Sequence, residues 1–332
     1  MVRILQGNEI DRKDWEHLGK TSKFGSFFQS PTCYDFYQKL SFLIPFVYAA
    51  VQNNTLQALV CGYIVADGGA AKRCFSRRAI IPGGILLSED IAVETLQTLL
   101  EKLKSELRQK VIYVEFRNYH DYFQYKSSFI AAGFSYKQHY DIHNVVGNVE
   151  NVWQGLSSSK KRQIFQSRKN GYTTVLAQSE EELKLFYALL SVLYTQKIGK
   201  PLFPHEFFEK IIREPFAKLF LVKKESNVVG GILTVEFQKK AVYEWFIAGD
   251  DMIKGIFPSA LATWAGIEYA AQHNFEYFDF MGAGSDVENQ GVREFKLKFG
   301  GKLIETGRFV LVNKLLIFNI AKVYLKMLNI VK

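Results

Sequence analysis

The stretch KLFLVKKESNVVGGILTVEFQKKAVYEWFIAGD (residues 218–250) alternates apolar and polar residues and is broken by a polar turn at Glu225–Asn227. This pattern predicts two strands joined by a tight turn and followed by a third strand. An earlier stretch, FVYAAVQNNTLQALVCGYIVADGG (46–69), has the same order of strand, polar turn and strand. The two stretches therefore predict that the chain contains one kind of structural unit twice.

The repeat continues through the later elements of each half. Both halves add a helical stretch, an aromatic strand, an apolar segment in which Gly adjoins Phe, and a closing strand. These segments are 91–110, 111–117, 129–134 and 135–146 in the first half, and 258–274, 275–282, 295–301 and 302–312 in the second. The repeated order predicts an α/β (α+β) protein with two tandem domains, each a mixed twisted sheet flanked by helices. We place the domains at 1–148 and 149–312, followed by a C-terminal helix at 313–332.

Length and composition agree with two folded domains. The chain has 332 residues, 48% of them hydrophobic, and a net charge of +9, which favours an anionic partner. Its three cysteines form no Cys-x-x-Cys pair, so we expect buried thiols and a reducing cytoplasm. No signal peptide and no membrane span are expected. His139 and His143 fall in a predicted strand, where they would not share a helix face, so no metal site is expected.

A basic helix is predicted where the two halves join. Ser157–Ser159 can cap its start and Gly171 can end it. Its cations are Lys160, Lys161, Arg162, Arg168 and Lys169. Cations in the first turn of a helix oppose the helix dipole, which favours a binding role over a stabilising one. A solvated basic face is the alternative.

The last twenty residues predict an amphipathic helix with one narrow polar stripe. The stripe is formed by Asn319, Lys322, Lys326 and Asn329, at intervals of three and four residues. A wide apolar face with a lysine stripe is typical of a helix in a membrane interface. Packing on the protein's own core is the alternative.

The familiar catalytic motifs are absent from the sequence, but the order of elements in each half is that of a GNAT-like acyltransferase. An acetyl-CoA enzyme of that class needs a glycine-containing turn whose backbone amides hold the pyrophosphate at a helix start. Met252, Phe257 and Pro258 occupy the corresponding turn of the second half. The fold therefore suggests acyl transfer, while this turn disfavours acetyl-CoA, and we expect no bound cofactor.

Several segments in order resemble the Fem family of peptidoglycan-bridge aminoacyltransferases, in the compact form without a helical-hairpin insertion. The matching segments are GSFFQS (25–30), PGGILL (82–87), LSSSKKRQIFQSRKNGY (156–172), LYTQKIGKP (193–201), FPSALATWAGIEYA (257–270), FDFMGAG (278–284) and GVREFKLKFGG (291–301). Family members transfer an amino acid from aminoacyl-tRNA to an amine on the stem peptide of a peptidoglycan precursor. The resemblance implies a cytoplasmic protein, peripheral at the inner membrane face, that acts as a monomer on a diphosphate-bearing precursor.

The resemblance also implies site residues. The family lysine of the Phe-Lys motif falls on Lys296, as the catalytic residue. The cations that hold the phosphates of the precursor fall within Lys161–Lys169, with Arg168 and Lys169 favoured over Lys161 and Arg162. We further expect Tyr243, Trp245, Arg293 and Lys298 to bind substrate.

Helical spacing also predicts, independently of the resemblance, that Lys296 lies where it can bind a substrate. Val292, Phe295 and Phe299 form one apolar stripe, and Lys296 lies at its edge, near a strand end where clefts form in α/β sheets. A cation there would stabilise a negative oxygen or hold a tRNA phosphate. We expect its replacement by Met to lower turnover with little effect on stability. The alternative functions are N-acyl transfer from a thioester to a sugar or lipid amine in exopolysaccharide synthesis, and membrane-associated binding without catalysis.

Overall fold

A computed structural model of the chain describes residues 2–69, 73, 75–287, 290–320 and 323. The chain divides into two compact units, one formed by Met1–His139 together with Glu305–Lys332, the other by Tyr140–Ile304. Two units were expected, but the expected boundary at 148/149 is wrong. The first unit ends nine residues earlier, at His139, and it also includes the C-terminal segment Glu305–Lys332.

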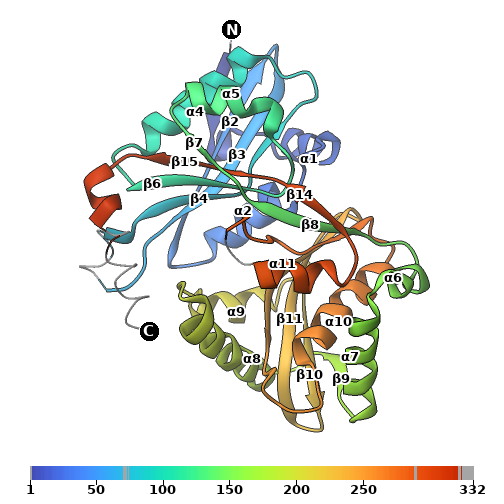
Figure 1. The fold of residues 1–332 in the computed structure, drawn as a ribbon. Coiled ribbons are helices and arrows are strands. Elements are labelled where there is room, and N and C mark those ends of the chain that lie inside the picture. Colours follow the sequence, from blue (N-terminus) through green and yellow to red (C-terminus); the bar gives the residue numbers. More distant parts are fainter. Residues whose placement is uncertain (1, 70–72, 74, 288–289, 321–322, 324–332) are drawn as a thin grey trace. The chain divides into compact units, whose positions relative to one another are not determined.

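The first unit is a mixed sheet with the strand order β1-β2-β3-β4-β6-β15-β7, in which β5 also pairs with β3 (Figure 1). Its strands are β1 (Val2–Gln6), β2 (Leu43–Gln52), β3 (Thr55–Val65), β4 (Arg78–Gly83), β5 (Ile85–Leu87), β6 (Tyr113–Asn118), β7 (Ser135–Lys137) and β15 (Arg308–Val312). Its helices are α1 (Arg12–Thr21), α2 (Pro31–Gln38), α4 (Val93–Leu107) and α5 (Lys126–Ala131). Strands β4 and β6 run parallel.

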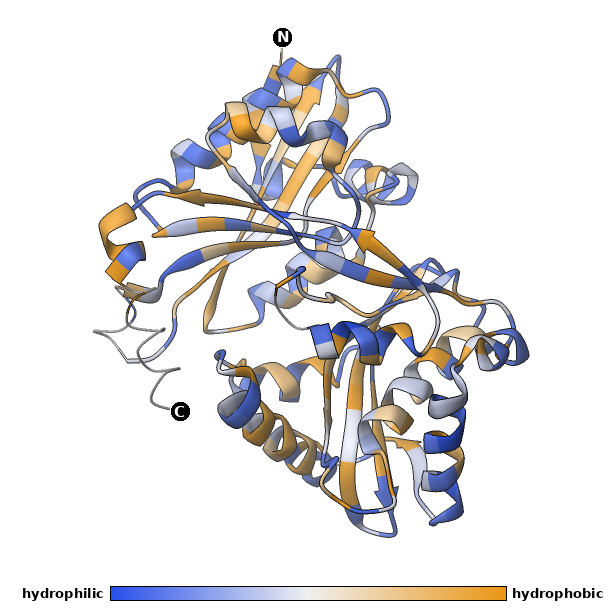
Figure 2. Ribbon diagram, viewed as in Figure 1, coloured by the Kyte–Doolittle hydropathy of each residue, from blue (hydrophilic) through white to orange (hydrophobic). Residues whose placement is uncertain are grey.

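Strand alternation gives this sheet two apolar faces. Tyr48 and Ala50 of β2 pack in a core with α4, whereas Val47 and Ala49 pack in a second core with α1 and α2. Because successive side chains of a strand point to opposite faces, a strand that is apolar at every position must be covered on both sides. Figure 2 shows the mostly hydrophobic strands β2 and β3 and, around them, helices in which hydrophobic and hydrophilic residues are mixed.

The second unit is a sheet with the order β14-β8-β13-β12-β11-β10-β9. Its strands are β8 (Tyr140–Val145), β9 (Thr173–Leu176), β10 (Ala217–Lys224), β11 (Asn227–Phe237), β12 (Ala241–Gly249), β13 (Tyr277–Asp279) and β14 (Lys302–Glu305). Its helices are α6 (Val149–Gly155), α7 (Ser158–Lys169), α8 (Glu180–Leu193), α9 (His205–Ile211), α10 (Pro258–Gln272) and α11 (Gln290–Leu297). Helices α7 and α10 lie on one face of the sheet, and α8 and α9 lie on the other (Figure 1).

The two halves of the sequence exchange their closing strands. The segment 135–146 was predicted as one strand that closes the first domain, but it splits into β7 in the first unit and β8 in the second. Likewise β15, predicted to close the second domain, pairs with β6 and β7 in the first unit. Each sheet therefore contains a strand from the other half of the chain.

The local predictions agree with the structure. The two hairpin turns contain residues with positive φ, Asn53, Asn54 and Glu225, as tight turns between strands require. The Ser157 side chain accepts a hydrogen bond from the amide of Lys160 at the start of α7, and Gly171, with φ of +84°, follows its end.

The C-terminal tail is described only in part. Phe318 packs against Tyr113, with ring centroids 5.4 Å apart, while Leu316 is 81% exposed. Lys322, Lys326 and Asn329 of the expected polar stripe lie outside the described residues. Within the described residues, no helix is both long and apolar enough to cross a membrane.

Candidate active site

The parallel strands β12 and β13 of the second unit separate after a short region of pairing. They pair at three positions, from Ala241 opposite Tyr277 to Tyr243 opposite Asp279. Strand β12 then continues to Gly249, whereas β13 ends at Asp279. A β-bulge at Trp245 shifts the register of β12 against β11 just beyond this point. We call this separation, between β12 beyond Tyr243 and the chain that follows Asp279 of β13, the strand split.

Lys296 of α11 occupies the strand split. Its Nζ donates to the carbonyl oxygens of Phe280 (2.5 Å) and Gly282 (2.9 Å) and lies 3.2 Å from Oε1 of Glu244 on β12. An ammonium group has three N–H donors, and these three acceptors can engage all of them. Lys296 therefore connects the end of β13 to β12 at the position where the two strands cease to pair.

The turn after β13 is shaped to present those carbonyl groups. Oδ1 of Asp279 accepts a hydrogen bond from the amide of Met281, and Oδ1 of Asp141 accepts one from the amide of Gly282. Met281 has φ of +53°, an uncommon conformation for a residue with a side chain, and Gly282 has φ of +106°. The two buried carboxylates thus hold the turn in a conformation that its local sequence alone would not favour.

A group of ionisable residues surrounds the split. Asp141, Asp279 and Glu244 are at most 4% exposed, and Oδ2 of Asp279 lies 3.2 Å from Nε2 of His143. Burial, followed by the negative charge of Asp279, raises the pKa of Asp141 to about 8. Burial also raises the pKa of Glu244, although the neighbouring Lys296 opposes the shift.

The burial of Lys296 corrects one expectation. The residue is 8% exposed and forms an ion pair with a buried carboxylate, so a substitution there should affect stability as well as turnover. The expectation of unchanged stability for Lys296→Met is therefore wrong on physical grounds. A direct contact between Lys296 and a substrate would require one of its three bonds to break.

The other predicted residues near the split differ in their surroundings. Arg293 of α11 donates to the carbonyl oxygen of Ser285, at 3.0 Å, and lies over the Tyr140 ring. Lys298 is exposed. Tyr243 is fully buried, with its hydroxyl 3.4 Å from that of Tyr277, whereas Trp245 is half-buried and packs against Phe207.

The predicted cations of α7 form one exposed face. At 100° per residue, the positions of Lys161, Arg162, Phe165, Arg168 and Lys169 fall on the same side of the helix. Phe165, in the middle of this basic face, is 67% exposed, and α7 is mostly hydrophilic in Figure 2. Arg168 pairs with Glu268 at 3.3 Å, and Nζ of Lys161 donates to the carbonyl oxygen of Gln154.

The start of α7 contacts α11 and the residue that follows it. The amide of Ser157 donates to the carbonyl oxygen of Lys298, and Nζ of Lys160 lies 3.5 Å from the centre of the Phe295 ring. Eight residues of helix separate Lys160 from Arg168, a rise of about 12 Å. The structure therefore brings Lys296, Arg293 and the start of α7 together, and places Arg168 and Lys169 at the other end of that helix.

Sequence reasoning missed several residues of the site. Glu244, Asp141 and Asp279 each lie within an ordinary strand pattern, and only the pairing of strands brings them to Lys296. Lys160 was treated as one of several surface cations, but it is 3% exposed, and burial lowers its pKa to about 8. An ammonium held against an aromatic face is stabilised by the ring, which accounts for its burial.

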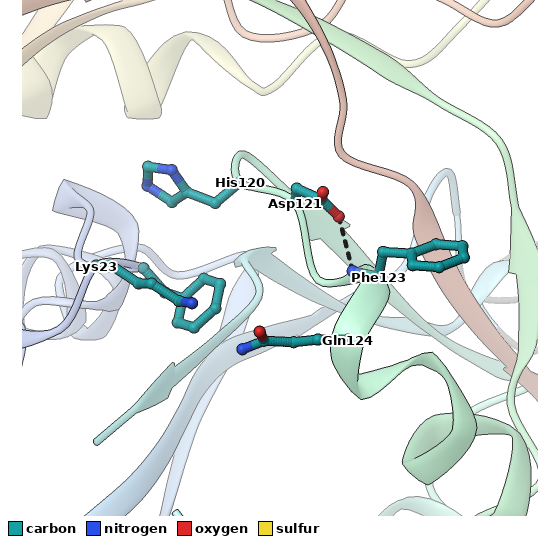
Figure 3. A pocket seen from close by; sticks show the side chains of 6 residues that line it. Lys23, His120, Asp121, Phe123 and Gln124 are labelled. Carbon is teal, nitrogen blue, oxygen red and sulfur yellow. Dashed lines mark hydrogen bonds between the residues drawn. The ribbon is translucent and has the colours of Figure 1, made fainter. Parts of the chain in front are cut away.

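A shallow pocket lies in the first unit, apart from the predicted site residues. Lys23, Phe24, His120, Asp121, Phe123 and Gln124 line it, as Figure 3 shows. Asp121 accepts a hydrogen bond from the amide of Phe123, and Nζ of Lys23 lies 5.0 Å from the centre of the Phe24 ring. Neither contact points to a reaction.

Comparison with known proteins identifies the fold. A family model described as an acetyltransferase (GNAT) domain matches residues 158–296. Among solved structures, FemX aligns over 96% of this chain and 99% of its own, with a TM-score of 0.71 and 15% identity. A tandem GNAT protein from the clavulanic acid biosynthesis pathway aligns over 94% and 99%, with a TM-score of 0.60 and 8% identity.

A third structure extends the comparison. L-PGS from Bacillus licheniformis aligns over 92% of both chains, with a TM-score of 0.56 and 14% identity. No curated protein sequence matches the chain at a significant level. Residues 158–296 thus match a GNAT domain, and the chain has a FemX-like tandem GNAT fold, as the sequence repeat and the resemblance to the Fem family predicted.

Proposed function

We propose that this protein transfers an amino acid from aminoacyl-tRNA to an amine of a cell-envelope precursor that carries a diphosphate, such as a peptidoglycan precursor. The observation that carries the proposal is the start of helix α10 in the GNAT-like second unit, where Pro258 and a carboxylate bound to Ser259 disfavour the pyrophosphate of acetyl-CoA. The FemX-like tandem fold and the sequence resemblance to the Fem family support an aminoacyl ester as the donor instead.

The start of α10 is already occupied by the chain itself. Pro258 at its first position has no amide hydrogen, and Asp251 accepts hydrogen bonds from the amide (3.2 Å) and hydroxyl (2.6 Å) of Ser259. The amide of Phe257 donates to Oγ of Ser167. Anions bind helix starts through free amides and the positive end of the dipole. A carboxylate already bound there would repel a pyrophosphate.

The basic face of α7 supports a diphosphate-bearing acceptor. Arg162, Arg168 and Lys169 are exposed on one side of the helix. Guanidinium and ammonium groups bind phosphate oxygens through charge-assisted hydrogen bonds. Arg168 is exposed and Glu268 is half-buried, and an ion pair at the protein surface contributes little, so a phosphate can compete with it.

The proposed reaction needs no redox chemistry. The amine nitrogen of the acceptor attacks the ester carbonyl carbon, a C–N bond forms, and the C–O bond to the tRNA ribose breaks. The ribose hydroxyl leaves with the proton that the amine loses. The carbonyl oxygen is negative in the intermediate, and the ammonium of Lys296 would stabilise it after exchanging one of its three bonds in the strand split for a bond to that oxygen.

The test is a transfer assay with both classes of donor. The purified protein is incubated with total charged tRNA or with acyl-CoA, against a panel of envelope precursors. We expect transfer from charged tRNA that disappears after ribonuclease treatment. Turnover with acyl-CoA alone would contradict the proposal and favour the thioester reading.

A further inference from the structure

Three side chains with metal-ligand chemistry meet on two neighbouring strands beside the strand split. Asp141 and His143 are two residues apart on β8 and therefore point to the same face. Asp279 on β13 lies directly opposite His143 in the register of the two strands. Ligand atoms of the three residues lie within 4.8 Å of one another, and Nε2 of His143 is 3.2 Å from Oδ2 of Asp279.

Each of the two carboxylates has one oxygen atom that accepts no hydrogen bond within the described residues. Oδ1 of Asp141 accepts from the amides of Ile142 (2.7 Å) and Gly282 (2.8 Å), and Oδ1 of Asp279 accepts from the amide of Met281 (2.7 Å). Oδ2 of each residue is buried and has no hydrogen-bond partner within the described part of the chain. A buried carboxylate oxygen without a hydrogen bond or a cation is costly, and such atoms call for an explanation.

The formal charge of the buried ionisable residues also favours a bound cation. Asp141, Asp279 and Glu244 are buried around the single ammonium of Lys296, which is paired with Glu244. With all three carboxylates ionised and His143 neutral, they and the ammonium sum to a formal charge of −2, and the raised pKa of Asp141 reflects the cost of that charge when no further cation is bound. One divalent cation would bring this group to neutrality.

We propose that Asp141, His143 and Asp279 bind one divalent transition-metal ion, through the two free carboxylate oxygens and an imidazole nitrogen. One nitrogen and two carboxylate oxygens suit Zn²⁺ or Mn²⁺. The ion would join β8 to β13 directly behind the turn that holds Lys296. No metal was expected from the sequence because His139 and His143 were considered as a pair. His139 instead lies 3.0 Å from the Arg308 guanidinium in the first unit.

Metal binding itself is the test and does not depend on the reaction. The full chain is treated with a chelator, dialysed, and titrated with Zn²⁺ or Mn²⁺ by calorimetry. We expect one ion per chain, a rise in Tm on binding, and release of protons as the ligands are freed for the metal. Both His143→Gln and Asp141→Asn should weaken binding by about 100-fold or more, since even supporting residues of a metal site contribute about 10- to 100-fold.

A matched control guards against incidental binding. His273 is an exposed histidine whose ring nitrogen contacts the carbonyl oxygen of its own helix, so His273→Gln should bind the metal as the wild type does. The proposal is overturned if the wild type binds no stoichiometric metal, or if His143→Gln binds it unchanged. In either case the cluster is stable without a metal ion. If Asp141→Asn fails to fold, metal binding by His143→Gln still tests the proposal, because His143 is partly exposed.

Discussion

Replacing Lys296 with Met should destabilise the second unit strongly. The Lys296 side chain is 10% exposed and that of Glu244 is 3% exposed, with 3.2 Å between the charged atoms. Removal of one partner from a buried ion pair leaves the other charge uncompensated and costs about 3–5 kcal/mol. This is a large part of the roughly 5–15 kcal/mol that separates folded from unfolded domains.

The destabilisation should depend on pH. Burial raises the pKa of Glu244 above its ordinary value of 4.5, and loss of the Lys296 charge removes the effect that opposes this shift. The folded protein then binds the proton more tightly than the unfolded chain does. The contribution of Glu244 to stability is therefore fully present below about pH 4.5 and is lost as the pH rises through the raised pKa. Lys296→Met should therefore lose more stability relative to wild type at pH 8 than at pH 5.

Urea unfolding at the two pH values measures this effect, and a double mutant isolates the pair. In Lys296→Met/Glu244→Gln the buried charge is gone, so much of the lost stability should return. Lys298→Met, two residues away and exposed, should change stability by less than about 0.5 kcal/mol. If Lys296→Met is as stable as the Lys298→Met control, or if Glu244→Gln gives no recovery, the buried-pair reasoning is refuted.

Three further predictions concern the substrates. Calorimetry should detect no saturable binding of acetyl-CoA, because Pro258 and Asp251 occupy the start of α10; micromolar affinity would contradict this. Charge reversal at Arg168 or Lys169 should raise the acceptor KM without unfolding the protein, whereas the control Lys184→Glu on α8 should leave the acceptor KM unchanged. An unchanged KM in the α7 variants would mean that the basic face of α7 is only solvated and binds no acceptor. Binding of tRNA should weaken steeply with salt, by about 0.7–0.9 logarithmic units per phosphate contact for each tenfold rise in salt; an affinity independent of salt would exclude phosphate contacts.

The repeated elements were predictable because their signals are local. Alternation at 218–250, the turns at Asn53–Asn54 and Glu225, and the Ser157 cap each depend on neighbouring residues only. The exchange of closing strands was not predictable in this way. The alternating pattern of 135–146 identifies a strand but does not say which sheet it joins.

The site was predictable in part for the same reason. Lys296 was found through the Fem resemblance and its place beside an apolar stripe. Its ion-pair partner Glu244 comes from β12, and Asp141, which holds the turn at Gly282, comes from β8. Both are more than fifty residues away in sequence and become visible only when the strands are paired. The burial of Lys160 against Phe295 likewise depends on the packing of α7 on α11.

The mass of the acceptor after reaction tests the central proposal most directly. A panel of diphosphate-bearing envelope precursors is incubated with the protein and total aminoacyl-tRNA, and the masses of the products are measured by mass spectrometry. The proposed function predicts a precursor whose mass has increased by one amino-acid residue, with no product when the tRNA is uncharged. An unchanged mass for every precursor with charged tRNA, together with an added acyl group when acyl-CoA is supplied, would contradict it.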